Sequence, residues 1–351
     1  MTEPLLSIQG LVTQFDTPDG TVRAVDGVSY DVYPGETVGV VGESGSGKSV
    51  TVMSVLGLIP QPPGRIAEGR VLLEDRDLLT LSNAQLRKVR GKDIAMIFQD
   101  PMTSLNPVLT VGSQIAEAIE THAPDRSEDA IRKQVVDLLA LVDVPNPDDR
   151  FDQYPHEYSG GMRQRAMIAM AIANEPKILI ADEPTTALDV TIQAQVLEVL
   201  KRAQDETNAG TILITHDLGV IAEMADRVVV MYGGRVVETG TVEEIFHSPR
   251  HPYTLGLLSS LPRPDTDLER LEPIPGQPPS LITLPSGCAF HPRCRLGQDR
   301  ERCHFETPEL LDLGAGRSTA CHYHDEMDEQ VRLIQEATGA QIEVETEADD
   351  T

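Results

Sequence analysis

The spacing of apolar residues changes from one segment of the chain to the next. Alternating apolar and polar residues at 5–32, on either side of a turn at 17–20, predict two β-strands. Residues 37–41 form a short apolar run, which is typical of a buried strand. Residues 48–58 then follow a helical spacing, and the proline-rich segment 61–64 ends the predicted helix.

The middle of the chain, residues 107–173, is predicted to be mainly helical, with a break rich in proline and aspartate at 144–149. Beyond residue 177, strand patterns alternate with helical patterns. These segments are 178–181, 190–202, 211–215, 218–225 and 228–232. Strands that alternate with helices predict an α/β fold with a largely parallel sheet.

The composition changes after about residue 262. Prolines at 262, 264, 273, 275, 278 and 279 predict a linker, and four cysteines follow. Residues 325–351 are strongly acidic, with a short helix predicted from Met327 to Ala337 before a disordered end. We therefore expect a main domain at 1–262, a small cysteine-containing domain at 263–325 and an acidic, partly disordered tail at 326–351.

The charge of the chain limits its partners. The 351 residues carry a formal net charge of −27, and only six of the 29 basic residues are lysine. No general nucleic-acid partner is expected, because phosphate backbones favour a basic surface. Two explanations of the acidic surface stay open. One is a halophilic cytoplasm, where salt screens the repulsion; the other is an ordinary acidic protein with an acidic tail.

The sequence carries no pattern of membrane insertion. The N-terminus lacks the basic segment and apolar run of a signal peptide, and no segment approaches the ~18 apolar residues of a membrane span. We therefore expect a soluble chain that reaches a membrane only through partner subunits.

A glycine-rich motif follows the strand predicted at 37–41. It fits G-x-x-x-x-G-K-[ST] and lies between a predicted strand and a predicted helix, as a phosphate-binding P-loop requires. Its backbone N–H groups can wrap the phosphates of ATP or GTP, Lys48 can reach the β- and γ-phosphates, and Ser49 can bind Mg²⁺. The motif consists of Gly42, Glu43, Ser44, Gly45, Ser46, Gly47, Lys48 and Ser49. The residue that follows it at position 50, Val50, is assigned no role in the site.

Two carboxylates follow the strand predicted at 178–181. Asp182 can hold Mg²⁺ through water, and Glu183 can polarise the water that attacks the γ-phosphate. Beside a P-loop, these two acids predict a nucleotide-hydrolysing site rather than a solvated acidic turn.

The stretch between these two motifs points to a family. Tyr158-Ser159-Gly160-Gly161-Met162 resembles the signature motif of ABC-transporter ATPases, with Met162 where glutamine is common. The resemblance implies an α/β P-loop ATPase with a RecA-like core, an antiparallel β subdomain, a helical signature subdomain at about 100–174 and a small cysteine-rich C-terminal domain. It also implies that Ser159, Gly160, Gly161 and Met162 face ATP bound to a second subunit, at the start of a helix.

The resemblance assigns further residues to the ATP site. Gln99 matches the Q-loop, Asp189 ends the match to the D-loop at 186–189, and His216 matches the switch histidine at the γ-phosphate. The implied catalytic residues are Lys48, Gln99, Glu183 and His216, and the implied Mg²⁺ ligands are Ser49, Gln99 and Asp182. Phe15 is the first candidate to stack on adenine and Tyr30 the second, with a place in the strand core as the alternative for Phe15.

Three segments resemble one branch of the family, the oligopeptide and dipeptide importers. They are 98–107 around the Q-loop, 181–195 around the D-loop, and His251-Pro252-Tyr253-Thr254 with Leu257-Leu258. The resemblance, from about residue 5 to 324, implies an ATPase that powers peptide import from the cytoplasmic face of the membrane. The implied partners are a sibling ATPase subunit of the F-type, two membrane permeases and an extracytoplasmic binding protein. Nickel and oligosaccharide importers of the same branch leave the cargo open.

The cysteines suggest a metal site. Cys288, Cys294, Cys303 and Cys321 are spaced C-x₅-C-x₈-C-x₁₇-C, and disulfides are disfavoured in a cytoplasmic protein. Four thiolates can hold a [4Fe–4S] cluster, which the resemblance also implies. Zinc is one alternative and unliganded core thiols are another. The histidines near enough in sequence to replace a thiolate on zinc are His291, His304, His322 and His324.

Two other classes of protein fit the sequence less well. A soluble ABC-type ATPase of DNA repair or translation predicts a coiled-coil insertion, or two cassettes behind an iron–sulfur domain, whereas this chain has one cassette followed by the cysteines. A non-catalytic regulatory subunit is disfavoured by the intact Lys48, Glu183 and His216.

Overall fold

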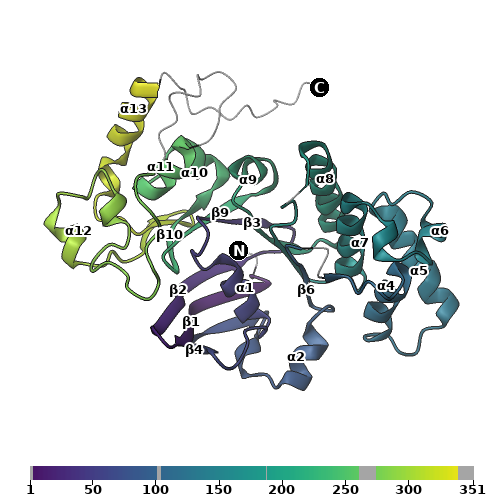
Figure 1. Cartoon of the computed structure of the whole chain (residues 1–351). Helices are drawn as coiled ribbons and strands as arrows, with labels where there is room; N and C mark the ends of the chain where they lie inside the picture. The colour runs from purple at the N-terminus through teal and green to yellow at the C-terminus, as the bar shows by residue number, and fades with distance from the viewer. Residues whose placement is uncertain (1–2, 101–103, 187, 261–273, 339–351) are drawn as a thin grey trace.

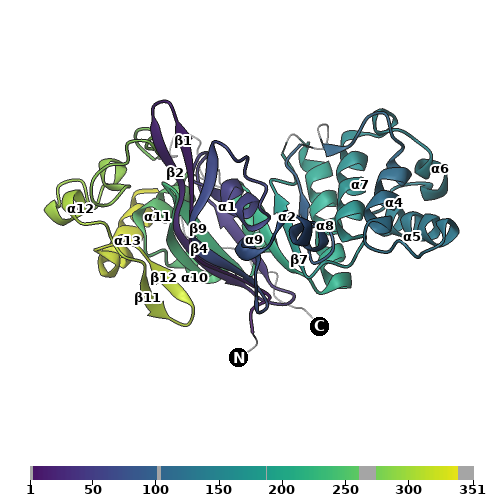
Figure 2. The ribbon, with the colours of Figure 1, turned by 90° about the horizontal axis from the view of Figure 1, so that it is seen from below.

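The computed structural model describes residues 3–100, 104–186, 188–260 and 274–338. A large sheet crosses the middle of the molecule, and a smaller sheet lies beside it (Figure 1). Two further parts occupy opposite ends: the helical region, residues 104–174, and the C-terminal region, residues 274–338 (Figures 1 and 2). Among the described residues, no helix is long and apolar enough to span a membrane.

The large sheet has the order β11-β12-β10-β9-β3-β8-β7-β6. Its strands are β3 (Thr37–Val41), β6 (Ile94–Ile97), β7 (Ile178–Asp182), β8 (Gly210–Ile214), β9 (Arg227–Tyr232), β10 (Arg235–Thr241), β11 (Leu311–Gly314) and β12 (Arg317–Thr319). The five strands from β9 to β6 are parallel, which confirms the α/β prediction. Strands β3, β7 and β8 are buried along their whole length because helices and strands cover both faces, which explains why their sequences are continuous apolar runs.

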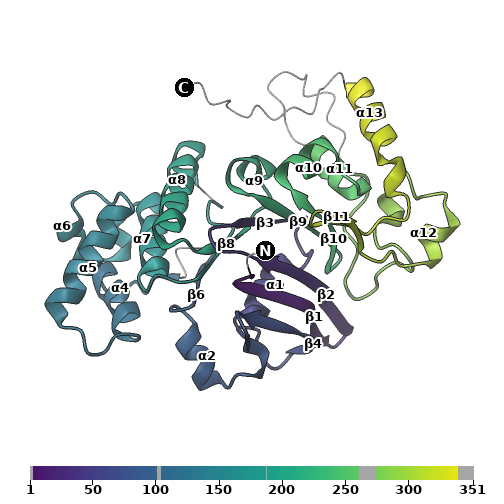
Figure 3. The same cartoon turned by 180° about the vertical axis from the view of Figure 1, so that it is seen from behind.

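The smaller sheet is antiparallel, in the order β2-β1-β4-β5. Its strands are β1 (Leu6–Thr17), β2 (Gly20–Val32), β4 (Gly64–Leu73) and β5 (Arg76–Asp77). The turn predicted at 17–20 joins β1 to β2, where the Thr17 hydroxyl donates to the Gly20 carbonyl at 2.8 Å. Helix α1 (Lys48–Val55) lies between the two sheets and packs Val52 and Val55 into their shared apolar core (Figure 3).

The helical region contains α4 (Val111–Glu120), α5 (Glu128–Leu141), α6 (Pro147–Phe151) and α7 (Gly160–Ile172), as predicted. Side-chain oxygens of Thr110, Ser127 and Ser159 cap α4, α5 and α7 by accepting backbone N–H groups of the first turn. The other helices are α2 (Asn83–Val89), α8 (Val190–Thr207), α9 (Leu218–Met224), α10 (Val242–His247), α11 (Pro252–Ser259), α12 (Glu301–Phe305) and α13 (Met327–Thr338).

The C-terminal region is joined to the core of the cassette. Strand β12 pairs with β10 and extends the large sheet, and Phe290 and Cys294 are buried in the main apolar core. The boundary expected near residue 262 stays a prediction, because 261–273 lie outside the described residues, as do residues 339–351 of the acidic tail. Helix α13 confirms the short helix predicted from Met327.

Candidate nucleotide site

The P-loop joins β3 to α1 as the motif predicts. Gly42 and Gly47 have φ angles of 151° and 104°, which side chains with a Cβ rarely adopt. A Cβ at Gly42 would collide with the Met231 carbonyl, and one at Gly47 with the Ala24 carbonyl. The glycines therefore allow the loop to pass close to β9 and β2 while its N–H groups stay available for phosphate.

Lys48 begins α1 and is buried beneath this loop. Its Nζ donates to the carbonyls of Gly42 at 2.7 Å and Glu43 at 3.1 Å. Burial lowers the pKa of Lys48, while the carboxylates of Glu183, Asp182 and Glu43 act against that shift. The ammonium group therefore lies among acceptors that a phosphate oxygen can replace.

Ser49 and Asp182 place two oxygens side by side at the start of α1. The Ser49 hydroxyl donates to Asp182 Oδ1 at 3.0 Å. Burial raises the pKa of Asp182, although the Ser49 hydrogen bond lowers it. A buried carboxylate next to a hydroxyl is a site that a divalent cation stabilises, and hard oxygen ligands suit Mg²⁺.

Position 50 contributes no further hydroxyl to this pair of oxygens. The residue there is Val50, whose side chain carries no hydroxyl group. The Val50 side chain is partly buried and packs against the apolar core between the two sheets. Its backbone carbonyl accepts the Ser54 hydroxyl at 2.7 Å within α1. The hydroxyl available to Mg²⁺ at the start of α1 is therefore that of Ser49.

Glu183 is the centre of the residues predicted to hydrolyse the nucleotide. Its Oε2 accepts hydrogen bonds from Gln99 Nε2 at 2.8 Å and Thr186 Oγ1 at 2.9 Å, and lies 3.6 Å from His216 Nδ1. Gln99, Glu183 and His216 follow the adjacent parallel strands β6, β7 and β8, whose carboxyl ends meet at one edge of the sheet. Thr186 was not expected to contact Glu183, and only its place within the D-loop match pointed to it.

The signature and D-loop residues lie away from the P-loop. Ser159 accepts the Met162 N–H at 3.3 Å, and Gly160 follows it at the exposed start of α7. Gly161 packs against Ile192 of α8, a contact that leaves no room for a Cβ. Asp189 caps α8, where its Oδ1 accepts the Ile192 N–H at 3.0 Å, and Ala187 lies outside the described residues. This part of the predicted site therefore faces outward from the chain.

The two adenine candidates differ in burial. Tyr30 is only 7% exposed and packs in the core between the sheets, so it is a core residue. Phe15 is half-buried and pairs across the β1–β2 hairpin with Val22, which lines a cavity together with Glu43, Ser44, Gly45 and Ser46. Directly paired residues share a face of the sheet, so the hairpin position of Phe15 is compatible with stacking on a base beside the P-loop.

The four cysteines are free thiols that line one small cavity. Burial raises the pKa of Cys288 to about 11 and that of Cys321 to about 12. Within the described part of the chain, no group of three or more His, Cys, Asp or Glu side chains is arranged to hold a metal ion. Two histidines suggested as substitute ligands are engaged in hydrogen bonds instead. His304 Nε2 donates to the Gln298 carbonyl, and His322 Nε2 donates to the Glu306 carbonyl.

Comparisons with known proteins agree with this geometry. The family model of ABC transporters matches residues 25–186, and the model of the oligopeptide/dipeptide transporter C-terminal region matches 237–303. The dipeptide transport ATP-binding protein DppD of Bacillus subtilis (strain 168) is 56% identical over 292 residues, which are 83% of this chain and 87% of DppD. The chain belongs to the ABC transporter ATP-binding proteins.

Other relatives lie in the same branch. The DppD protein of Escherichia coli (strain K12) is 51% identical over 91% of this chain and 96% of its own length. Among solved structures, the dimeric ATP-binding cassette MJ0796, in a post-hydrolysis state with ADP and Pi, is 26% identical with a TM-score of 0.61. That match covers 68% of this chain and 98% of the cassette. The ABC ATPase fold and the branch expected from the motifs are both confirmed.

Proposed function

We propose that this protein hydrolyses ATP to power the import of dipeptides and oligopeptides through an ABC transporter. The observation that carries the proposal is the Glu183 carboxylate, held by Gln99, Thr186 and His216 at the edge of an intact P-loop. The peptide cargo is supported by the C-terminal match and by relatives named dipeptide and oligopeptide transport ATP-binding proteins.

Each residue of the site has a role in this reaction. The P-loop N–H groups and Lys48 hold the phosphates, and Phe15 stacks on adenine. Ser49, Gln99 and Asp182 would hold Mg²⁺, which neutralises phosphate charge. Glu183 accepts a proton from the attacking water, and His216 lies close enough to stabilise charge at the γ-phosphate.

A second subunit completes the site. The outward start of α7 presents Ser159, Gly160, Gly161 and Met162 to ATP bound by a partner cassette, and Asp189 lies beside them at the start of α8. The likeness to a dimeric cassette supports this arrangement. We take the partner to be a sibling ATPase of the F-type rather than an identical copy.

The permeases are proposed to dock between the core and the helical region. An apolar cavity of about 390 Å³ there is lined by residues that include Met96, Phe98, Leu105 and Met167, and Phe98 is exposed. Phe98 precedes Gln99, so a docked permease would sense the state of the ATP site directly. We propose on this basis that the chain works at the cytoplasmic face of the membrane, below permeases fed by an extracytoplasmic binding protein.

Glu183→Gln tests the hydrolytic role. Loss of the general base should lower ATP hydrolysis by roughly 10²–10⁴-fold while ATP binding is kept. Glu198→Gln, an exposed change on α8, is the matched control and should leave hydrolysis unaltered. Near-normal turnover of Glu183→Gln would remove Glu183 as the base. Stimulation of the assembled transporter by peptide, but not by nickel or oligosaccharide, would test the cargo.

A [4Fe–4S] cluster on Cys288, Cys294, Cys303 and Cys321 is a separate proposal. Four thiols that share one cavity are the donor set that such a cluster requires. The free space between them is about 10 Å³, so a cluster would move the thiols apart, whereas a single zinc ion needs less room. Protein purified without oxygen should absorb broadly near ~400 nm and release acid-labile sulfide. Colourless protein with stoichiometric zinc, or with neither metal, would reject the cluster.

The acidic composition supports a further proposal, adaptation to high salt. Counterions screen the repulsion of a net charge of −27. The free energy of unfolding should then rise steeply with potassium chloride concentration. A free energy of unfolding that does not change with salt would reject this adaptation and favour an ordinary acidic protein with an acidic tail.

A further inference from the structure

The P-loop is held from outside by two residues that come from the far end of the sequence. Arg293 of the C-terminal region donates two hydrogen bonds to the Glu43 carboxylate, from Nη1 to Oε2 at 2.6 Å and from Nη2 to Oε1 at 2.9 Å. Tyr253 of α11 accepts the Glu43 backbone N–H through its hydroxyl at 2.8 Å. Both the side chain and the backbone of this loop residue are therefore fixed by a part of the chain that binds no phosphate itself.

The contact is buried and directional. The Arg293 side chain is 6% exposed and that of Glu43 is 26% exposed, so solvent screens the pair little. Bidentate pairs between arginine and a carboxylate are strong and specific in geometry, because two parallel hydrogen bonds must be satisfied together. This pair therefore fixes the orientation of Glu43 as well as its distance.

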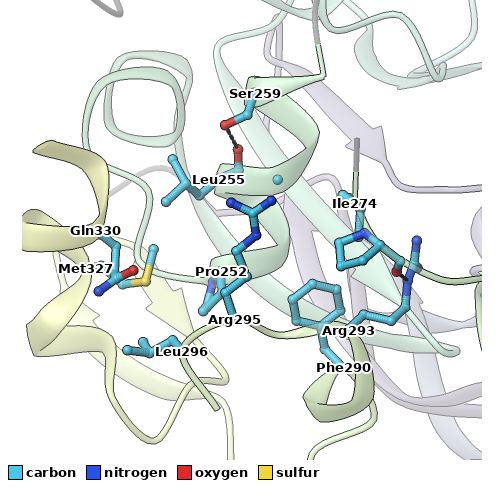
Figure 4. Close-up of a pocket in the computed structure, with 12 residues that line it drawn as sticks. Pro252, Leu255, Ser259, Ile274, Phe290, Arg293, Arg295, Leu296, Met327 and Gln330 are labelled. Carbon is cyan, nitrogen blue, oxygen red and sulfur yellow. Dashed lines mark hydrogen bonds between the residues drawn. The ribbon is translucent and has the colours of Figure 1, made fainter. Parts of the chain in front are cut away.

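Arg293 is itself held in place. Its Nε donates to the Pro275 carbonyl at 2.8 Å (Figure 4). Its guanidinium group lies near the rings of Tyr232 and Phe290. Ile274 and Phe290 also line an apolar cavity of about 70 Å³ beside α11 and α13 (Figure 4). The guanidinium group is therefore oriented before any nucleotide binds.

The local chain also ties Arg293 to the cysteines. Arg293 ends a short turn, His291–Arg293, whose first N–H donates to the Cys288 carbonyl at 3.0 Å, and Cys294 follows directly. The position of the guanidinium group thus depends on the backbone between the first two cysteines.

The held residue lies where it can affect ATP. The Glu43 carbonyl accepts a hydrogen bond from Lys48 Nζ, so the backbone fixed by Arg293 and Tyr253 also positions the phosphate-binding lysine. Glycines at 42, 45 and 47 give the loop conformational freedom that ATP binding must otherwise remove. A loop that is ordered in advance binds its ligand more tightly, because less entropy is lost on binding.

We propose that Arg293, together with Tyr253, is a positioning residue for the P-loop, through which the C-terminal region sets the affinity of the cassette for ATP. The proposal rests on the proposed function, because it assumes that this P-loop binds ATP. Neither residue touches the substrate; both act through Glu43.

The test is a double-mutant cycle on the equilibrium affinity of the full-length chain for MgATP, measured by calorimetry well below the unfolding temperature. Arg293→Met and Glu43→Gln should each weaken binding about tenfold, the scale of a lost charge-assisted hydrogen-bonded pair. The double variant should bind MgATP no more weakly than whichever single variant has the lower affinity, because the two residues act as one unit. In the assembled ATPase, KM should rise while kcat stays near the native value.

Two further variants separate positioning from folding. Arg293→Lys keeps the charge but not the bidentate geometry and should bind ATP with intermediate affinity. Tyr253→Phe removes only a hydroxyl and should weaken ATP binding even if Arg293→Met fails to fold.

The matched control is Arg300→Met, which breaks another bidentate pair of the C-terminal region, with Glu326 at 2.7 and 2.6 Å. It should leave the affinity for MgATP unchanged. Folded Arg293→Met, Glu43→Gln and Tyr253→Phe that all bind within twofold of the native chain would overturn the proposal, as would additive losses in the cycle. Native protein that binds MgATP no better than Lys48→Ala would instead reject the proposed function.

Discussion

The helical region and the C-terminal region lie at opposite ends of the molecule and are attached to the central sheet in different ways. The helical region packs through fully buried apolar side chains such as Ile115, Val135 and Ile168, and its ion pair with α8, Arg202–Asp143, is exposed. The C-terminal region adds buried charges to its apolar contacts. Its Arg317 lies 3.7 Å from Glu238 on β10, a carboxyl that is 0% exposed, and its Thr319 hydroxyl donates to the Arg250 carbonyl at 3.1 Å.

The difference bears on what each region can do. Apolar contact is non-directional, so a helical region held mainly by it can shift in orientation while breaking only a few part-buried hydrogen bonds, such as those from His122 to the Arg90 carbonyl and from Asn174 to the Gly91 carbonyl. Buried polar contacts lose much of their energy when their geometry changes, so they hold the C-terminal region, and with it Arg293, in one position. The helical region is therefore suited to move towards a partner's ATP, and the C-terminal region to keep its own P-loop fixed.

Among the changes that test this contrast between the two regions, Ser159→Arg should have the largest effect, which is on ATP turnover. It removes the cap that accepts the Met162 N–H and places a bulky cation at the exposed start of α7. Loss of a phosphate-stabilising donor costs about 10²–10³-fold in rate. ATP turnover by the two-subunit complex should therefore fall at least about 100-fold, while the isolated chain binds MgATP as before.

Ser127→Arg is the control for the signature change, because Ser127 caps α5 of the same region in the same way. It should cost roughly 1 kcal/mol of stability without affecting turnover. A Ser159→Arg chain that loses its own affinity for MgATP would mean that the helical region acts on its own P-loop, and the contrast between the two regions would fail.

Glu238→Ala should have the next largest effect, which is on the stability of the fold. Without the carboxylate, the N–H groups of Arg250 and His251 lose a buried acceptor and Arg317, 3.7 Å away, loses its charge partner. We expect the free energy of unfolding in urea to fall by about 3 kcal/mol. Arg202→Met, which breaks the exposed pair of the helical region, should cost less than about 1 kcal/mol. Equal losses would show that the two attachments do not differ.

The ATP site could be predicted from the sequence because its parts follow strands whose apolar runs are easily recognised. Glu183 and His216 follow β7 and β8, and the topology of a parallel sheet brings such strand ends together. Gln99 and His216 were both assigned by resemblance; the strand before His216 was also predicted from the pattern, whereas β6, only four residues long, was not. The helical region was predicted for a similar reason, since its apolar faces repeat over several turns.

The contacts of the C-terminal region could not be predicted in this way. Arg293 and Glu43 are 250 positions apart, and no local pattern in either segment indicates the other. The extension of the large sheet by β10, β11 and β12 was also missed, because β11 and β12 are only four and three residues long and the pairing of all three strands depends on tertiary contacts. The spacing of the cysteines predicted a shared site, and their common cavity agrees with that, but spacing alone does not determine which ligand they hold.

The stability that Glu238 contributes beside Arg317 of the C-terminal region should also depend on pH, with a small change for each pH unit. Burial raises the pKa of Glu238 to about 7, from 4.5, and lowers that of the neighbouring His251 to about 3. The folded state then binds the Glu238 proton more tightly than the unfolded state, so this contribution is complete below about pH 4.5 and is lost as the pH rises to about 7. The depressed pKa of His251 acts in the opposite direction between pH 3 and 6.5, and partly hides this loss in the native chain.

Glu238→Gln separates the two contributions, because His251 is present in both proteins and cancels in the difference. The stability of the native chain relative to Glu238→Gln, measured in urea at several pH values between about 4.5 and 7, should fall by at most about 1.4 kcal/mol per pH unit. A constant difference would mean that Glu238 is ionised throughout this range. In that case Glu238 would form an ion pair with Arg317 of the C-terminal region at every pH in this range, rather than lie beside it as a neutral carboxyl.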